Sequence, residues 1–348
     1  MSEDKLPELG KIHPEFFDRV IYPRLGAQDK SIIIGPCHGV DYGVLKIGDT
    51  FLSFSTDPFF IVPAYGFSRA AWFAFHIIMS DVAVSGLTPK YLTVDLNLPP
   101  EIKESELEEM WESVHKEAKK YGVSIITGHT ARYAGCNYPM VGGGTAIAIG
   151  PESELRGPHK VKQGDKIIIT KGPAVETTGL LAISFPQKFI DAFGDKFQKD
   201  AENIFYQMSV MDDCAIASKF PGVHAMHDAT ECGILGGLYE MARAGDYGMH
   251  VEKDLIVTQD VIMKTCEHFK IDPYIAISEG TLIAIVDPNE ADLLVGEFKW
   301  KGIVSSVVGE VTDKANGVEI LEKGVSSKLT HPRVDPFWSV FEELLAGN

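Results

Sequence analysis

Residues 80–89 read Ser80-Asp81-Val82-Ala83-Val84-Ser85-Gly86-Leu87-Thr88-Pro89, a segment in which an apolar helix ends and a strand follows. The helix opens at Tyr65-Gly66, and Ser68 can act as its cap. Its inward positions recur at helical spacing, at Ala71, Phe75, Ile78, Val82 and Ser85. Gly86 and Pro89 stop the helix, and residues 92–98 then alternate as a strand does. Asp81 therefore lies late in a mostly apolar helix.

Strands and helices interleave on both sides of this segment. The first half predicts strands at 31–34, 44–46, 51–55, 92–98, 123–127 and 140–149, the fifth of them buried, and a second helix at 104–121. The second half predicts strands at 166–170, 223–226, 248–251, 281–286 and 304–310, and helices at 176–183, 199–220, 236–244, 289–298 and 338–345. A polar stretch at 151–157 is typical of a domain boundary. We therefore expect an α/β fold of α+β layers in two domains, residues 1–155 and 156–348.

Composition limits the classes of partner. Lys and Arg number 32 against 49 Asp and Glu, and the net charge of −17 disfavours nucleic acid and anionic membranes. Nucleotides are not excluded, because carboxylates bind magnesium and magnesium binds phosphates. No signal peptide or membrane span is expected, because the first twenty residues are acidic and no apolar run approaches ~20 residues. The five cysteines form no zinc or redox pair, which predicts reduced thiols and a cytoplasmic protein.

Three aspartates fall where a strand or helix gives way to a turn. Asp41 lies in a glycine-flanked loop, Asp57 ends a strand before Pro58, and Asp81 lies late in the first helix. Carboxylates at such positions can converge on one hard cation, which keeps waters and phosphates as its other ligands. Each could equally be a turn or capping aspartate. His224 and His227 resemble a metal pair, but residues three apart on a strand point to opposite faces.

Two further segments could receive a phosphate. Gly128-His129-Thr130 follows a predicted strand, and its glycine lets the backbone approach a ligand closely. His227-Asp228-Ala229-Thr230 precedes a helix that starts near Gly233, whose first amides could bind an anion together with the Thr230 hydroxyl. The alternatives are a packing histidine at His129 and helix caps at Asp228 and Thr230. The run Gly142-Gly143-Gly144-Thr145 is not a phosphate-binding P-loop, because no Gly-Lys-Ser/Thr follows it.

The order of these motifs resembles the aminoimidazole ribonucleotide synthetase superfamily. The matching segments run from Gly10-Lys11-Ile12 through Gly39-Val40-Asp41, Ser55-Thr56-Asp57-Pro58, residues 80–89, Gly128-His129-Thr130 and residues 227–233 to Ser278-Glu279-Gly280-Thr281-Leu282. They cover roughly residues 10 to 315. The likeness is greatest to archaeal proteins related to the hydrogenase maturation factor HypE. It implies an N-terminal sheet that forms a barrel across a homodimer, with ATP at the interface, and a C-terminal α/β domain that completes the cleft.

The resemblance also implies roles for particular residues. Asp41, Asp57 and Asp81 would bind the magnesium that bridges to the phosphates of ATP. Gly128, His129 and Thr130 would line the same site, and Thr56 would lie beside the nucleotide. Asp228 and Thr230 would face the nucleotide from the second domain.

Departures from the family pattern leave two functions open. Relatives carry a second acid beside Asp41, kinase relatives carry an aspartate in place of His129, and a dehydrating HypE ends in an acceptor cysteine, whereas this sequence ends Ala346-Gly347-Asn348. We expect an ATP-dependent enzyme that activates an oxygen of an unknown small substrate by phosphoryl transfer, without HypE-type dehydration. The alternative is a nucleotide-binding accessory or scaffold protein of metallocentre maturation, which binds ATP and a partner protein without turnover.

Overall fold

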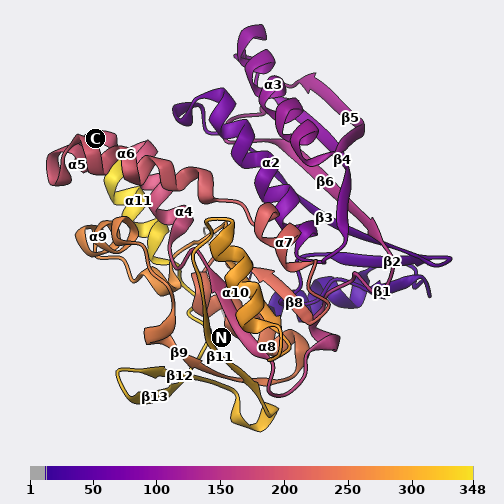
Figure 1. The fold of residues 1–348 in the computed structure, drawn as a ribbon. Helices are drawn as coiled ribbons and strands as arrows, with labels where there is room; N and C mark the ends of the chain where they lie inside the picture. The colour runs from indigo at the N-terminus through magenta and orange to yellow at the C-terminus, as the bar shows by residue number, and fades with distance from the viewer. Residues whose placement is uncertain (1–11, 13, 348) are drawn as a thin grey trace, which may run out of the picture.

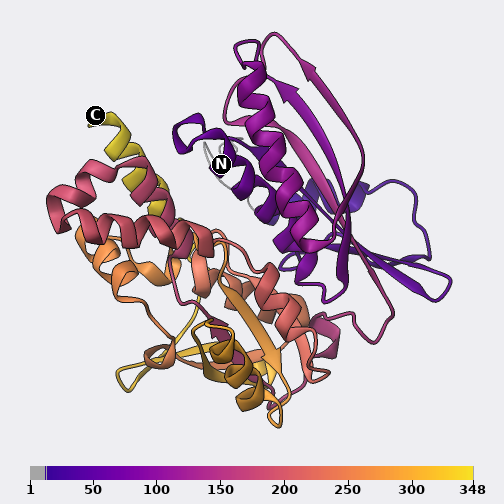
Figure 2. The ribbon, with the colours of Figure 1, turned by 45° about the horizontal axis from the view of Figure 1, so that its top comes forward.

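A computed structural model describes residue 12 and residues 14–347. The leader at residues 1–10, the Gly10-Lys11 part of the first family motif and Asn348 lie outside the described residues. Two β-sheets organise the described chain, and each has its own helices (Figures 1 and 2). No described helix is long and apolar enough to cross a lipid bilayer.

The first sheet has six strands in the order β1-β2-β3-β6-β4-β5. These are β1 (Ile32–Ile34), β2 (Gly43–Ile47), β3 (Thr50–Phe60), β4 (Thr88–Leu98), β5 (Ser124–Arg132) and β6 (Met140–Gly150), preceded by α1 (Pro14–Phe16). Helix α2 (Phe67–Ala83) packs on this sheet and α3 (Glu104–Tyr121) packs on α2. Along β3, Phe51, Ser53 and Ser55 are buried while Leu52, Phe54 and Thr56 are more exposed. The alternation gives the sheet a face covered by α2 and an opposite, open face.

Strand β5 corrects one prediction from the sequence. Residues 123–127 were predicted to form a buried strand, but β5 covers Ser124–Arg132 and is mostly exposed, with Ile126 53% exposed. The reason is its place in the sheet, because β5 is the last strand and pairs only with β4. Its outer edge has no neighbouring strand among the described residues. Gly128-His129-Thr130 consequently lies inside an edge strand and not in a loop that follows it.

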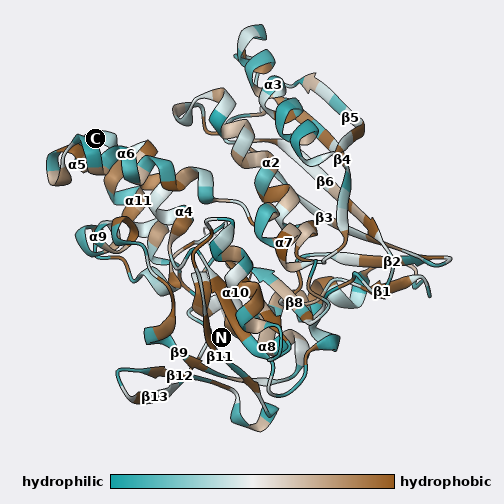
Figure 3. Ribbon diagram, viewed as in Figure 1, coloured by the Kyte–Doolittle hydropathy of each residue, from teal (hydrophilic) through white to brown (hydrophobic). Residues whose placement is uncertain are grey.

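The second sheet has seven strands in the order β13-β12-β9-β11-β7-β10-β8. These are β7 (Lys166–Thr170), β8 (Val223–Asp228), β9 (Gly248–Glu252), β10 (Leu282–Val286), β11 (Ser305–Thr312), β12 (Val318–Glu322) and β13 (Val325–Lys328). In β7, Ile167 and Ile169 pack with α8 (Gly233–Gly245), whereas Ile168 belongs to the core that includes α10 (Ala291–Trp300). Helices on both faces explain the apolar sequence of β10 and the three isoleucines of β7. Figure 3 shows the strands beside α10 largely in brown.

The remaining helices of the second half are α4 (Val175–Ser184), α5 (Pro186–Phe193), α6 (Asp195–Ile204), α7 (Met211–Ala217), α9 (Asp260–Phe269) and α11 (Pro336–Ala346). The single helix predicted at 199–220 is wrong, because α6 and α7 are separate. Between them the Ser209 carbonyl accepts from Lys171, and the Val210 amide donates to Ser80. Because the Ser209 carbonyl and the Val210 amide hydrogen-bond to side chains, they are not available for helical hydrogen bonds, and the helix is interrupted there. The domain boundary at 155/156 stays a prediction, placed between β6 and β7.

Candidate metal and nucleotide site

Carboxylates from both sheets meet at one place in the structure. Asp57 lies in β3, Asp81 near the end of α2, Asp228 at the end of β8 and Asp41 just before β2. Burial, and then the charges of Asp57, Asp228 and Asp41, raise the pKa of Asp81 well above its usual value. Glu279, in the loop before β10, joins them, since the charges of Asp228 and Asp57 act on it after burial. These five residues, Asp41, Asp57, Asp81, Asp228 and Glu279, are called the acid cluster below.

Helix α2 approaches β3 closely enough to bring Asp57 and Asp81 together. The hydroxyl of Ser55 donates to the Ile78 carbonyl over 3.1 Å, which ties the strand to the helix just before the two acids. Gly144 of β6, paired with Asp57, permits the approach, because a Cβ there would lie 2.8 Å from the Ile78 side chain. The glycine run in β6 therefore serves close packing, as expected for a strand that is not a P-loop.

Several oxygens of the acid cluster lack a partner. Both oxygens of Asp228, one of Asp57 and one of Glu279 are buried without a hydrogen bond among the described residues. Burial, and then the charge of Asp41, raise the pKa of Asp228 to about 7, and burial followed by the charge of Asp228 raises the pKa of Glu279. Orphaned carboxylate oxygens in an anionic pocket fit a divalent cation, since hard cations take oxygen ligands. Asp41 and Asp228 are the carboxylates that could share a cation as placed here, whereas no group of three ligand atoms within 4.8 Å among the described residues includes Asp57 or Asp81.

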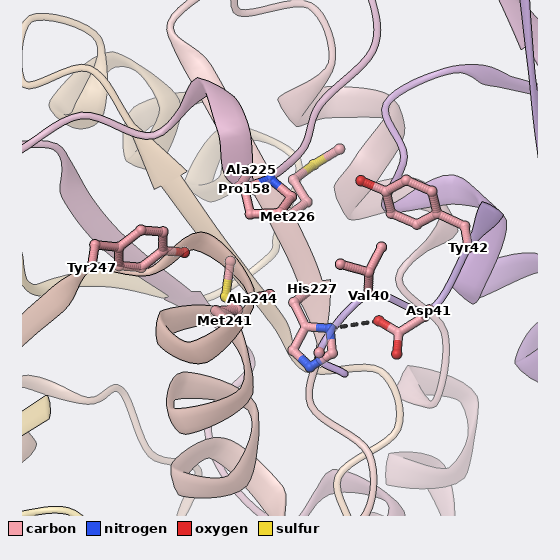
Figure 4. Close-up of a pocket in the computed structure, with 11 residues that line it drawn as sticks. Val40, Asp41, Tyr42, Pro158, Ala225, Met226, His227, Met241, Ala244 and Tyr247 are labelled. Atoms are coloured by element: carbon pink, nitrogen blue, oxygen red, sulfur yellow. Dashed lines mark hydrogen bonds and ion pairs between the residues drawn. The ribbon is translucent and has the colours of Figure 1, made fainter. Parts of the chain in front are cut away.

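His227 fixes the position of Asp41. Its Nδ1 lies 2.5 Å from a carboxylate oxygen of Asp41 (Figure 4). Its Nε2 lies 3.3 Å from Glu240 of α8. Burial lowers the pKa of His227, but Asp41 and Glu240 outweigh it and leave the pKa well above the ordinary value. His227, Asp41 and Asp228 offer ligand atoms within 4.8 Å of one another. Because both imidazole nitrogens already engage carboxylates, His227 acts as a counter-charge that orients Asp41.

His224 lies elsewhere, as the sequence predicted. Its Nδ1 is 2.7 Å from Asp165, whereas His227 engages Asp41 and Glu240. The two histidines therefore do not share a ligand or a metal among the described residues.

The helix that follows Asp228 is not capped as one alternative supposed. Cys232 occupies the N-cap position of α8 without a capping side chain, and its amide donates to Asp335 over 2.8 Å. Neither Asp228 nor Thr230 caps the helix, and the Thr230 carbonyl instead accepts from the amides of Gly233 and Ser278. The Asp228 side chain therefore does not cap α8, and it makes no hydrogen bond among the described residues although it is fully buried.

The other predicted nucleotide residues lie away from the acid cluster within one chain. Thr56 is on the opposite face of β3 from Asp57, and its hydroxyl lies 2.9 Å from that of Thr145. Asp57 pairs with Gly144, Gly144 with Val94, and Val94 with Gly128, so Gly128 lies level with Asp57 but three strands across the sheet. At the usual strand spacing this is a separation of about 14 Å. His129 contacts Tyr133 at 2.8 Å, and Thr130 is exposed.

Family models for the N-terminal and C-terminal domains of AIR synthase related proteins match residues 39–149 and 162–322. The chain belongs to the AIR synthase related family. The resemblance inferred from the order of motifs is thereby confirmed.

Individual relatives are distant but extend over most of the chain. A Methanocaldococcus jannaschii protein, named as a candidate hydrogenase expression/formation protein, is 23% identical over 94% of this chain and 96% of its own. The carbamoyl dehydratase HypE of Escherichia coli is 24% identical over 82% and 83%. The E. coli HypE structure has a TM-score of 0.70 over 82% of this chain and 87% of its own, at 23% identity. A HypE structure in complex with ATP has a TM-score of 0.64 over 93% of both chains, at 20% identity. The predicted two-domain α/β fold is confirmed.

Sequence reasoning about this AIR synthase related chain missed the roles of His227 and Glu279. His227 was considered as half of a metal pair and as part of the segment at residues 227–233, and its role as partner of Asp41 depends on a contact across 186 residues. Glu279 stood inside a quoted family motif without a role. Burial raises the pKa of Glu176 to about 8, and its side chain accepts from the Glu279 amide. The sequence did offer a clue to both residues. His227 directly precedes Asp228, and Glu279 lies inside the family motif at residues 278–282.

Replacing His227 by glutamine should destabilise the protein by about 3 kcal/mol, because Asp41 and Glu240 lose a cationic partner that is only 4% exposed. The pKa of His227 is raised in the folded state. This pair therefore stabilises the protein fully at acid pH, and its contribution is lost only as the pH rises through the raised value. Urea unfolding at pH 6 and pH 8 measures the loss.

The matched control is His250→Gln, because the pair of His250 with Glu319 is 3.5 Å long and 35% exposed on both sides. That change should alter the free energy of unfolding by less than about 1 kcal/mol. Equal effects of the two substitutions would contradict the proposed role of His227.

Proposed function

We propose that this protein is a magnesium-dependent enzyme that uses ATP to transfer a phosphoryl group to an oxygen of a small substrate. The supporting observation is the set of buried, unpartnered oxygens on Asp57, Asp228 and Glu279. Such a site favours a divalent cation, and a cation in turn holds phosphates. A HypE structure with ATP bound supports the choice of nucleotide. Magnesium, when bound, would neutralise charge that develops on the transferred group.

The residues of this chain have separable tasks in the proposal. Asp57, Asp81 and Asp228 hold the cation from two strands and a helix, so their positions depend on both sheets. Asp41 contributes its second oxygen, while His227 keeps the first in place. The loop at 229–232 supplies Thr230 beside the start of α8, where an anion is favoured by the helix dipole.

A homodimer would explain the separation of Thr56, Gly128, His129 and Thr130 from the acid cluster. We propose that the open faces of two N-terminal sheets pair, so that the nucleotide is bound between copies. The open face carries Leu52, Phe54 and Ile147, which are only partly buried in one chain. An apolar sheet face of this kind is normally covered.

Light scattering should therefore give a particle of twice the 38.2 kDa chain mass. Tyr91→Glu should reduce it to one chain, because Tyr91 lies on the open face and is 36% exposed. Trp300→Glu on α10, where the side chain is 73% exposed, should leave the mass unchanged. A wild-type protein that scatters as one chain at micromolar concentration would contradict the dimer.

A second function is favoured by the contacts of His227. Because His227 neutralises Asp41, and no second acid stands beside Asp41, the cation has one fewer free negative charge than in the family pattern. An accessory protein that binds ATP without turnover, and assists metallocentre maturation with a partner protein, would tolerate this loss. Release of ADP by the purified protein separates the two functions.

Asp57→Asn and Asp81→Asn should each weaken ATP binding in the presence of Mg²⁺ by about 10- to 100-fold, or about 1.4 to 2.8 kcal/mol. Asparagine keeps the size and one carbonyl oxygen but removes the charge that the cation requires. Without Mg²⁺ both variants should melt at or above the wild-type temperature, since each removes one of several mutually repelling charges. Calorimetric titration with ATP and melting curves measure the two effects.

Asp49→Asn is the control, because Asp49 is exposed in the turn between β2 and β3. It should change neither quantity. If Asp57→Asn and Asp81→Asn instead lower the melting temperature and leave ATP affinity intact, the two acids are structural turn residues.

A further inference from the structure

A separate cavity of about 290 Å³ lies where the helices of the two halves meet. Its walls come from α2, the end of α3, the segment that leads into α7, and residues 302–304 before β11. The acid cluster contributes no residue to its lining. The volume is near the lower end of the roughly 300–1,000 Å³ range of small-molecule sites.

Aromatic rings form one wall of this cavity. Trp72 of α2 lies against His76, with ring centroids 4.1 Å apart and the two planes tilted by 37°, and meets Tyr206 edge to face at 5.2 Å. Tyr206 is 52% exposed although it packs against Trp72. Tyr121, at the end of α3, also lines the cavity and lies 5.6 Å from His76. Such a wall favours a flat molecule and attracts a cation through the faces of its rings.

The charges at the cavity leave one carboxylate uncompensated. Lys171 and Asp213 form a buried pair of 2.7 Å, so these two charges cancel. Asp212, in the first turn of α7, has no Lys, Arg or His within salt-bridge distance among the described residues, and it lines the cavity. Asp212 is solvent-exposed, and after burial its negative charge and its hydrogen bond with the Tyr121 side chain raise the pKa of Tyr121. Lys120 at the rim is 54% exposed and is 3.8 Å from Glu117.

An amide completes the polar side of the cavity. Gln207 and Gln259 hydrogen-bond each other through both of their side-chain amides, over 3.2 and 2.8 Å. The second N–H of Gln259 goes to the Lys171 carbonyl, but Gln207 keeps one N–H and one lone pair. Gln207 can therefore bind a donor or acceptor carried by a ligand.

We infer that this cavity is a second ligand site, which binds a small planar molecule bearing an amine, an amidine or a protonated ring nitrogen. Asp212 neutralises the cation, the wall of Trp72 and Tyr206 contacts the flat body, and Gln207 makes the remaining hydrogen bond. The inference goes beyond the proposed function, because this site holds neither metal nor phosphate.

The bound molecule acts as an effector and not as the phosphoryl acceptor. Lys171 separates the cavity from the acid cluster, since its ammonium donates to the carbonyls of Ser209 and Gly280 and to Asp213, each over 2.7 Å. Gly280 directly follows Glu279 of the acid cluster. Helix α2 joins the two sites as well, because His76 lines the cavity and Asp81 lies five residues later. A ligand that stiffens these shared walls changes cation affinity, and by linkage the cation changes affinity for the ligand.

Benzamidine and its neutral isostere benzamide are suitable probes, tested by ¹⁹F NMR on protein labelled with 5-fluorotryptophan. The chain has four tryptophans, and Trp111, Trp300 and Trp338 can be replaced one at a time to assign the resonance of Trp72. Benzamidine should move the Trp72 resonance saturably at millimolar concentration. Benzamide should bind more weakly, by up to about fivefold, because it cannot pair with the exposed Asp212 carboxylate.

Asp212→Asn should abolish the preference for benzamidine, whereas Asp292→Asn, which removes an exposed acid from the first turn of α10, should keep it. Saturating benzamidine should also shift the Mg²⁺ concentration that half-stabilises the protein against heat. The site is refuted if Trp72 does not respond or if Asp212→Asn keeps the preference. If Trp72 responds but the Mg²⁺ midpoint does not change, the effector role is refuted. If the protein does not bind Mg²⁺ at all, the proposed function fails, while the Trp72 response still tests the second ligand site.

Discussion

Repulsion among buried carboxylates is the constraint around which this structure is arranged. Asp57, Asp81 and Asp228 come from different elements, and burial already disfavours the charged forms of Asp81 and Asp228. Burial, and then the charge of Asp41, raise the pKa of Asp228 to about 7, so without a cation its charged form is disfavoured. Natural chains keep such a destabilising arrangement where a ligand supplies the missing positive charge.

The two sheets are needed to assemble this arrangement, and neither contains all of it. The first sheet places Asp57, and α2 places Asp81 because Ser55 and Gly144 let the helix pack closely on the strands. The second sheet places Asp228 at the end of β8, a strand whose residues are all buried. The contact of His227 with Asp41 then joins the loop of one half to the strand of the other. Relative movement of the two halves would therefore change the acid cluster directly.

The sequence predicted the parts of the site that depend on local pattern. Asp57 and Asp81 stand at recognisable ends of a strand and a helix, and the order of motifs was sufficient to identify the family. The role of His227 could not be read in the same way, because Asp41 lies 186 residues away and no local pattern records that distance. The exposure of β5 was also missed, because its apolar residues predict burial while only the strand order places it at an edge. A partner copy that covers this edge or the open face would reconcile the apolar sequence with its exposure.

Anomalous diffraction from crystals grown with ATP and Mn²⁺ tests the central claim most directly, because manganese replaces magnesium at oxygen-ligand sites and can be located independently of the protein atoms. We expect a manganese peak within coordinating distance of Asp57, Asp81 and Asp228, with the phosphates of ATP on its far side. A peak bound elsewhere, or a nucleotide bound without any metal at the acid cluster, would contradict it.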